Sequence, residues 1–518
     1  MKLNKYIVAG CIALMGATTS CVGDLDLKPN DPNKKLELST VDEWDGYLGR
    51  LYGNLYRDDI ISTSDGGAGT FTRTHFNLQE ITADECFISE KWNDPGYQPL
   101  NKNTWSADNE WIYAAFAREF FNAKMCAEFI AAMNSEGSAY LQANGYDEAE
   151  TNSRIGEAHA LRGLAYYYMI DLFGRGPWID ESSTTGAIPP TYNRSELFDA
   201  IVAELVATAD MIKPAAQQAY GRITREAAYM ILAKLYLNSE VYTGTARYQE
   251  CANALQKVVG TGLTLAPEYK YLFCSSNDKY VGNGEILFAV PQQQGRMETW
   301  GGTTYLTAGC WIETVPKDVL TALNYSGDAW SGLRLRPELS KSLQGDPRRL
   351  IYEGTFQEEI PDLVAYDVNS CGYMLIKYTN TTEDDYTNTA GATNNNTAMS
   401  NTDYPVFRLA DAYLMLAECQ LRGVNCDGLK YFNMVRERVG LSTSGALTES
   451  LLLTERMNEL YMEGHRRSDL IRFGRYTGNA YVWSWKNGVY EGASIPEYRA
   501  LYPIPTQYVG TVGQNAGY

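Results

Sequence analysis

Hydrophobic residues recur at spacings of three and four along several stretches of the chain, which is the period of an amphipathic α-helix. The clearest block covers residues 154–259, where the pattern predicts four helices separated by short breaks. Ser195 and Thr224 stand where the second and third of these helices need an N-cap. Further helices are predicted over 40–56 and 108–133. Successive helices with small residues at their contacts are typical of tetratricopeptide-like stacking.

The segment from Phe407 to Arg475 predicts three more amphipathic helices, because each of its apolar sets falls on one helical face. Gly440 follows the second helix, and Thr448 stands before the third as an N-cap. The three apolar sets begin with Leu409, Tyr413, Leu416; Leu429, Phe432, Val435, Val439; and Leu453, Met457, Leu460.

The helical period fades between about residues 261 and 402, where Gly, Asn, Thr and aromatic residues dominate. A short strand is predicted within Glu285–Gln292. The run from Thr379 to Thr402 has almost no apolar residue, which predicts an exposed loop. The segment therefore differs in kind from the helical blocks on either side of it.

These patterns predict a mainly α protein, built as a tetratricopeptide-like helical-hairpin scaffold that carries an irregular, loop-rich subdomain. At 518 residues the chain is long enough for one large domain or two interlocked ones. The predicted organisation is an export signal over 1–20, a tether over 21–38, a helical region over 39–260, the irregular subdomain over 261–402, and C-terminal hairpins with a tail over 403–518.

The first twenty residues have the pattern of an export signal, with Lys2 and Lys5 before the apolar run Tyr6–Ala17. That run is too short to be a stable membrane span. Small residues precede Cys21, an arrangement that resembles a bacterial lipoprotein cleavage box and predicts lipidation of Cys21. The alternative is an ordinary signal peptide followed by a cysteine that has no such role.

Composition narrows the classes of function. With 63 acidic and 44 basic residues the net charge is −19, which repels phosphate backbones and argues against nucleic-acid binding. The chain has only three histidines and no zinc-type spacing, which argues against a zinc site and a histidine-dependent triad. Its 38 tyrosines suit both helix packing and wet surfaces that bind polar ligands. Cys126, Cys251 and Cys419 lie within helical patterns and are predicted to be buried thiols.

A neutral-sugar site needs flat aromatic faces for C–H surfaces and polar side chains for hydroxyl groups. Two loop-rich segments supply both kinds of residue. The candidates are Asp65, Arg73, Asn77, Trp92, Asn93 and Asp94 in the first segment, and Trp300, Tyr305, Trp311 and Trp330 in the second. Aromatic residues beside glycines in loops are exposed more often than those in helical stripes, although any of these residues can equally belong to the core.

Three C-terminal motifs occur in order: RLADAYLMLAE at Arg408–Glu418, N-x-x-R-x-R-x-G-L at Asn433–Leu441, and EGHRRSDLIRFG at Glu463–Gly474. Together with the ending YPIPTQ…QNAGY at Tyr502–Tyr518, they resemble the SusD/RagB family of outer-membrane nutrient-binding lipoproteins. Charged residues in the third motif invite a catalytic interpretation, but helices with alternating charges usually form ion pairs with their neighbours.

The resemblance extends over nearly the whole mature chain to a starch-binding member of that family. It implies a SusD-like fold and a surface site where aromatic residues with an Arg, an Asp and an Asn hold an α-glucan. By position, Asp65, Arg73, Asn93, Trp300 and Trp330 fall at those contacts. Ile88 and Glu90 stand where that member has tryptophans, so Trp92 is the residue that can compensate. These departures bear on which glycan is bound.

The resemblance further implies a non-catalytic lipoprotein on the cell exterior, anchored in the outer membrane, that delivers starch or α-glucan oligosaccharides to a SusC-like TonB-dependent transporter. It also implies a calcium site with Asp278, Asn401 and Asp403 as oxygen ligands, for which solvated loop side chains are the alternative. No other cofactor is implied.

Three alternatives for the function stay open. The first is a surface glycoside hydrolase, which needs a pair of carboxylates roughly 5–10 Å apart. The second is a binder of a different neutral glycan, and the third is a helical-repeat adaptor that binds protein. No carboxylate pair is singled out by the sequence, so binding without catalysis is the favoured prediction.

Overall fold

The computed structural model describes residues 38–61, 63, 67, 69–89, 92, 94–183, 186–311, 316, 319, 323–324, 326–330, 332–361, 363, 371–387 and 398–518. Contacts divide the chain into two compact units, residues 1–45 and 46–518. The predicted export signal, the tether and Cys21 lie outside the described residues.

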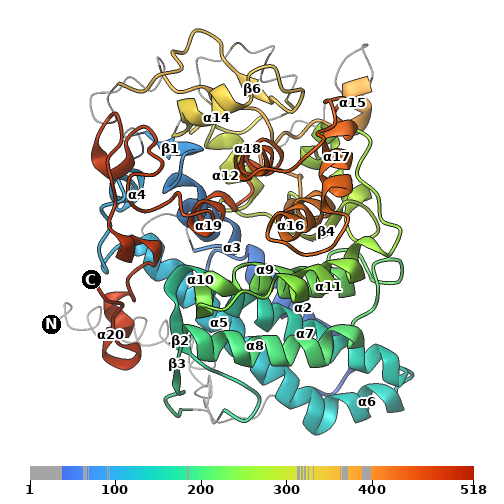
Figure 1. Cartoon of the computed structure of the whole chain (residues 1–518). Helices are drawn as coiled ribbons and strands as arrows, with labels where there is room; N and C mark the ends of the chain where they lie inside the picture. The colour runs from blue at the N-terminus through green and yellow to red at the C-terminus, as the bar shows by residue number, and fades with distance from the viewer. Residues whose placement is uncertain are drawn as a thin grey trace, which may run out of the picture. The chain divides into compact units, whose positions relative to one another are not determined.

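Long helices build the N-terminal half, and the prediction of a mainly helical fold is confirmed. Neighbours in sequence pack on one another: α5 on α7, α7 on α8, and α9 on α11 (Figure 1). Their bounds are α2 Val41–Tyr56, α3 Phe71–Phe76, η2 Asn77–Ile81, α4 Tyr97–Asn101, α5 Glu110–Ala132, η3 Met133–Gly137, α6 Ser138–Ala143, α7 Glu148–Tyr168, η4 Met169–Phe173, α8 Arg194–Thr208, η5 Ala209–Met211, α9 Arg225–Leu237, α10 Ser239–Thr243 and α11 Tyr248–Val259.

Side-chain caps fix where these helices begin. Thr224 caps α9 as predicted, accepting a hydrogen bond from the backbone N–H of Ala227. The prediction that Ser195 caps α8 is wrong, because Asn193 is the cap and forms a reciprocal capping box with Glu196. Ser195 lies in the first turn instead. At the end of η4, Gly174 adopts φ +66°, a left-handed conformation that favours glycine and stops the helix.

The middle of the chain is irregular, with short elements. The strands of the described residues, which include three in the N-terminal half, pair as two-stranded antiparallel ladders: β1 with β5, β2 with β3, β4 with β8, and β6 with β7. The strands are β1 Cys86–Ile88, β2 Arg175–Pro177, β3 Thr191–Asn193, β4 Ile286–Val290, β5 Leu333–Leu335, β6 Ile351–Tyr352, β7 Met374–Leu375 and β8 Tyr404–Arg408. The helices are η6 Tyr269–Phe273, η7 Asn277–Tyr280, α12 Thr303–Ala308, α14 Pro337–Ser342 and α15 Glu383–Thr387.

The C-terminal helices return to the N-terminal stack, since α16 packs directly on α11 and then on α17 and α18. In Figure 1 α16, α17, α18 and α19 lie above the α7–α11 layers, whereas α20 lies at the lower left. Their bounds are α16 Leu409–Leu421, α17 Gly428–Arg438, α18 Glu449–Leu460, α19 Arg466–Arg472, η8 Lys486–Gly488, η9 Glu497–Ala500 and α20 Thr506–Val512.

Two predictions about the segment Phe407–Arg475 are corrected. Phe407 belongs to strand β8, which pairs with β4, so the first helix begins at Leu409. The expected third helix is two helices, because Met462 (φ +60°) and Gly464 (φ +79°) break it between α18 and α19. The N–H groups of this turn donate to buried carboxylates, from Met462 to Glu85 at 2.7 Å and from Gly464 to Glu80 at 2.6 Å.

A buried ionic network joins the C-terminal helices to the strands. Arg408, 2% exposed, binds Glu463 at 2.6 Å, Glu285 at 2.6 Å and Glu459 at 2.9 Å. These carboxylates hold the pKa of the Arg408 guanidinium well above its usual value despite its burial. The prediction that the charges of the third motif form structural ion pairs is confirmed. The pairs are Glu463–Arg408, Arg466–Asp84, Asp469–Arg456 and Arg472–Glu418.

The run Thr379–Thr402 differs from the predicted exposed loop at both of its ends. Asn380 and Thr402 are buried, and the Thr402 hydroxyl donates to the Thr379 carbonyl at 2.5 Å. Hydrogen bonds of this kind allow polar side chains to be buried at low cost. The stretch 388–397 lies outside the described residues.

All eight cysteines in the described ranges are free thiols. Cys126, Cys251 and Cys419 are buried as predicted, at 2%, 0% and 0% exposure. Among the helices that the structure describes, none combines the length and apolar character that a membrane crossing requires.

Candidate functional site: an aromatic series that reaches the surface

Two polar side chains, Arg73 and Asn77, lie at the base of the candidate site. Thr70 caps helix α3 and accepts a hydrogen bond from the Arg73 N–H at 3.3 Å. Asn77 begins the π-helical turn η2 directly after α3. Residues four apart on a helix share one face, so both side chains extend toward the same group of rings.

The guanidinium of Arg73 lies among aromatic rings, and Arg73 is only 1% exposed. Its central carbon is 4.4 Å from the ring centroid of Tyr305, 5.1 Å from that of Trp111 and 5.4 Å from that of Trp92. It also donates a hydrogen bond to the Tyr97 hydroxyl at 2.9 Å. Cation–π contacts in a desolvated site are each worth about 1–2 kcal/mol, so Arg73 holds the rings in place from beneath.

Asn77 fixes the two tyrosines of this group. The Tyr305 hydroxyl donates to the Asn77 side-chain oxygen at 2.7 Å, and the Asn77 amide donates to the Tyr97 hydroxyl at 3.5 Å. Burial raises the pKa of Tyr305 well above its ordinary value, so the hydroxyl stays protonated and remains a donor. The buried layer of the site is therefore rigid and fully hydrogen-bonded at these positions.

From this layer a series of rings leads outward. Trp92 stacks on Tyr305 with centroids 5.7 Å apart and on Tyr97 at 5.8 Å. Trp330 lies 5.8 Å from Trp92, and Trp300 lies 5.8 Å from Trp330. Tyr97 and Tyr305 are fully buried, Trp92 and Trp330 are half-buried, and Trp300 is 45% exposed. We call Tyr305, Trp92, Trp330 and Trp300 the ring series.

The β1–β5 ladder brings Trp92 and Trp330 together. In this antiparallel pair Ile88 lies opposite Leu333, so the chain after β1 and the chain before β5 meet at the same end. A backbone hydrogen bond from the Ser89 N–H to the Gly332 carbonyl at 2.8 Å extends the pairing, and one from the Trp330 N–H to the Ala308 carbonyl at 2.8 Å ties Trp330 to the end of α12. Trp92 and Trp330, more than 200 positions apart in the sequence, are thereby held in contact with their rings tilted.

Glycines allow the backbone to approach the rings closely. A Cβ at Gly332 would lie 2.1 Å from the Trp92 ring, and one at Gly301 would lie 2.0 Å from the Gly67 carbonyl oxygen. Gly67 itself has φ +82°. The glycine beside Trp300 therefore lets Gly67 pack closely against this backbone.

The structure brings together four of the residues predicted to bind glycan: Arg73, Trp92, Trp300 and Trp330. Arg73 lies beneath the rings and not on the surface. Asp65 and Asn93, which were also predicted at the site, lie outside the described residues. Trp311, an aromatic candidate from the sequence, is fully buried.

Sequence reasoning missed Tyr97 and Trp111 as members of this site. Trp111 is in the first turn of α5, where its apolar neighbours gave it the pattern of a core residue. Its ring centroid lies 4.4 Å from that of Tyr97. No local signal in the sequence separates these two rings from ordinary core aromatics.

The three predicted calcium ligands have different surroundings. Asp403 is 2% exposed and accepts hydrogen bonds from the Tyr220 hydroxyl at 2.5 Å and the Gln292 N–H at 2.9 Å. Burial, with a smaller contribution from the Asp278 carboxylate, raises the pKa of Asp403 to about 7. Asp278 is exposed, and Asn401 accepts a hydrogen bond from the Gln294 N–H at 2.8 Å. The described residues contain no group of three His, Cys, Asp or Glu side chains arranged for a metal ion.

The chain matches known proteins in both sequence and structure. Residues 325–518 match the SusD family. The starch-binding protein SusD of Bacteroides thetaiotaomicron is 29% identical, over 100% of this chain and 99% of its own length. A SusD-like protein of Bacteroides ovatus is 25% identical, over 83% of this chain and 80% of its own length.

Solved structures of the same fold cover nearly the whole chain. Surface glycan-binding protein A from Bacteroides fluxus has a TM-score of 0.72 at 19% identity, covering 93% of this chain and all of its own. Surface glycan-binding protein A from Bacteroides thetaiotaomicron, solved in complex with laminarihexaose, has a TM-score of 0.69 at 19% identity, covering 92% of this chain and all of its own. The resemblance predicted from the C-terminal motifs is therefore confirmed: residues 325–518 match the SusD family, and the chain is similar over its whole length to the starch-binding protein SusD.

Proposed function

We propose that the protein binds a neutral glycan on the ring series without catalysing a reaction on it. The observation that carries this proposal is the graded exposure of the rings, from buried Tyr305 to Trp300 at 45%. A pyranose ring presents apolar C–H faces that stack on such surfaces. Half-buried tryptophans supported from beneath bind without first having to be ordered, which reduces the entropic cost of association.

The proposed ligand is starch or another α-glucan oligosaccharide. This choice rests on similarity to the starch-binding protein SusD along the entire chain. Structures that include a laminarin-binding protein share the fold at about 20% identity, so laminarin is the competing ligand to compare. Purified protein is expected to be retarded in a native gel that contains amylopectin and to release no reducing sugar from it. Unretarded migration would overturn the proposal, and released sugar would favour a hydrolase.

We further propose that the protein acts on the cell exterior, held in the outer membrane by a lipid on Cys21, and passes its ligand to a SusC-like TonB-dependent transporter. The sequence around Cys21 and the family resemblance support this proposal. A Cys21→Ala variant expressed in its native host is expected to lose membrane association and co-purification with such a transporter. Retention of both in that variant would contradict the proposed anchor.

A Gly332→Ala substitution is expected to weaken glycan binding although it touches no ligand. The added Cβ lies 2.1 Å from the Trp92 ring, so Trp92 has to move away from Trp330. We expect about a tenfold weaker affinity, the scale of a shifted contact residue. Gly445→Ala is the control, because a Cβ at Gly445 has no atom within 4 Å and the backbone there does not have a positive φ. Gly295→Ala is unsuitable, since its φ of +80° would strain an alanine. Equal affinity of Gly332→Ala and Gly445→Ala for amylopectin would contradict this role of Trp92.

Calcium is proposed as a structural ion held by Asp278, Asn401 and Asp403. Their donors are all oxygens, which calcium prefers, and no cationic side chain pairs with Asp403 among the described residues. At 5 mM calcium, a site with a dissociation constant of about 0.1 mM would stabilise the fold by about 2 kcal/mol. In a chain of this size, that corresponds to roughly 2 °C in the unfolding midpoint.

The check is differential scanning fluorimetry in calcium and in EGTA. We expect the calcium-dependent rise in wild-type protein and its loss in Asp403→Asn, which keeps the shape of the side chain. Glu298→Gln, at an exposed carboxylate, serves as the control. Identical midpoints in calcium and EGTA for the wild type would remove the calcium proposal.

A further inference from the structure

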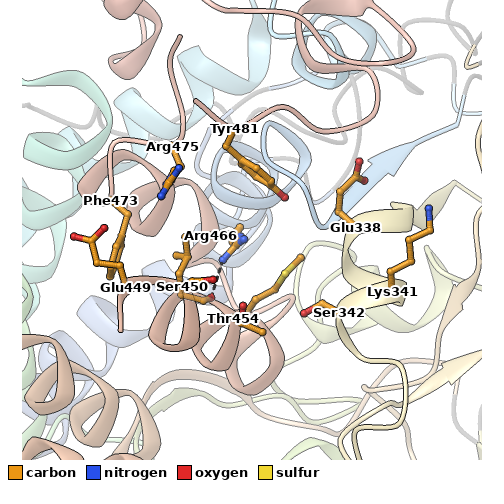
Figure 2. Close-up of a pocket in the computed structure, with 12 residues that line it drawn as sticks. Glu338, Lys341, Ser342, Glu449, Ser450, Thr454, Arg466, Phe473, Arg475 and Tyr481 are labelled. Carbon is orange, nitrogen blue, oxygen red and sulfur yellow. Dashed lines mark hydrogen bonds between the residues drawn. The ribbon is translucent and has the colours of Figure 1, made fainter. Parts of the chain in front are cut away.

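A second candidate site lies away from the ring series, among the C-terminal helices. It is a surface pocket of about 540 Å³, within the range of small-molecule sites. Figure 2 shows side chains of α14 on one side, the exposed face of α18 below, and residues from α19 and the segment after it on the other side. Its lining includes Glu338, Lys341, Glu449, Arg466, Arg475 and Tyr481.

The pocket is preformed because its inner wall is locked by hydrogen bonds. Arg466 binds both oxygens of buried Asp84, at 2.7 and 2.8 Å, and donates to the Leu453 carbonyl of α18 at 3.2 Å. The Tyr481 hydroxyl donates to Asp84 at 2.7 Å. One carboxylate therefore fixes a guanidinium and an aromatic ring in the wall, so that little ordering is needed on binding.

Most charges around the pocket are already neutralised. Arg466 is paired with Asp84, and Lys341 with Glu359 at 2.5 Å. Glu338 accepts hydrogen bonds from Ser484, and burial raises the pKa of its carboxyl. Arg475 and Glu449 have no side-chain partner within the part of the chain that the structure describes. The free charges are thus one cation and one anion, which favour neither an anionic nor a cationic ligand.

We propose that this pocket is a second saccharide site, selective for a neutral sugar. The Arg475 guanidinium can donate hydrogen bonds to neighbouring hydroxyl groups of a sugar, and the Glu449 carboxylate can accept them. Hydrogen bonds to charged groups are stronger than those between neutral groups. Ser450 and Thr454 add exposed hydroxyl groups along α18. Half-buried Tyr481 supplies an apolar face for the sugar C–H groups, and the largely buried Phe473 also lines the pocket. The inference goes beyond the proposed function and does not depend on the ring series.

The β1–β5 ladder places this pocket at the opposite end from the ring series. Trp330 precedes β5, whereas Glu338 follows it on α14; Trp92 follows β1, whereas Asp84 precedes it. The ladder itself is three residues long, about 10 Å. Two modest sites on one protein raise the retention of a polymer through effective concentration, without any gain in the affinity of either site.

Hydrogen–deuterium exchange with maltohexaose and laminarihexaose as probes tests the second site directly. We expect either sugar to slow exchange in peptides over 449–457 and 473–481 of the wild type. That protection should persist in the double variant Trp300→Ala, Trp330→Ala. In Arg475→Ala the sugar concentration for half-maximal protection should rise at least about tenfold. Arg50→Ala, at another exposed arginine, serves as the matched control.

Comparing exchange at 300–308, in the ring series, with exchange at 449–457, in the second site, distinguishes the two binding proposals. Protection at 449–457 without protection at 300–308 would overturn the ring-series assignment and support the second site. Absence of protection at 449–457 and 473–481 with both sugars would overturn the second site, as would equal half-maximal concentrations in Arg475→Ala and the wild type. If Arg475→Ala unfolds, Glu449→Gln replaces it, since Glu449 is exposed and the change keeps its shape.

Discussion

Replacing Trp330 or Trp300 by alanine is expected to remove most glycan binding, with a loss of about 2 kcal/mol or more, roughly 30-fold in affinity. Trp330 lies between Trp92 and Trp300, with centroids 5.8 Å from each, so its removal interrupts the ring series. Trp300 is the most exposed member and offers the largest free ring face. Retardation in native gels that contain amylopectin measures the loss.

Tyr490→Ala provides the matched control, because Tyr490 is an exposed aromatic residue at 36% on another loop. We expect it to migrate like the wild type, and we expect all three variants to unfold at similar temperatures, since Trp300 and Tyr490 are exposed and Trp330 is only half-buried. Unchanged retardation of both Trp300→Ala and Trp330→Ala would contradict the assignment of the glycan-binding site to the ring series.

The largest effect on stability is expected from Arg408→Met. The substitution replaces the guanidinium by a shorter apolar side chain and leaves Glu285, Glu459 and Glu463 without their shared cation in a fully buried environment. Breaking a buried ion pair by removing one partner costs about 3–5 kcal/mol. The unfolding midpoint in urea should therefore fall substantially, with the slope of the transition unchanged.

Arg57→Ala tests whether burial of the ion pair decides the loss of stability. Arg57 pairs with Asp59 at the surface, with both side chains about half exposed. Such pairs are worth about 0–1 kcal/mol, so its midpoint should stay near that of the wild type. The unfolding midpoint of Arg408→Lys should lie between those of Arg408→Met and Arg57→Ala. Lysine keeps the charge but lacks the planar guanidinium that contacts three carboxylates at once. A midpoint for Arg408→Met equal to that of Arg57→Ala would contradict the structural role of the network.

Periodicity predicted the scaffold well because long amphipathic helices carry their signal locally. The helix predicted over 108–133 appears as α5, the last of the four predicted within 154–259 appears as α11, and Thr224 is the cap that its position predicted. The pattern failed where tertiary contacts decide. Phe407 looks like the start of a helix, yet pairing with β4 draws it into β8. The turn at Met462 depends on buried Glu80 and Glu85, which lie almost 400 residues earlier.

The candidate site was predictable only in part, for a related reason. Trp300 and Trp330 stand out because they lie in loops near glycines. The role of Arg73 beneath the rings, and the membership of Tyr97 and Trp111, depend on contacts between distant segments. The meeting of Trp92 with Trp330 arises from the β1–β5 ladder, whose three-residue strands are too short to leave a pattern of their own.

Calorimetric titration of the wild-type protein with neutral polysaccharides tests the central claim most directly. The panel contains amylopectin, pullulan, laminarin, levan and xylan. We predict saturable binding of amylopectin and pullulan, with laminarin weaker and no saturable heat from levan or xylan. Binding of laminarin alone would contradict the α-glucan assignment, and the absence of saturable heat with every member of the panel would contradict glycan binding itself.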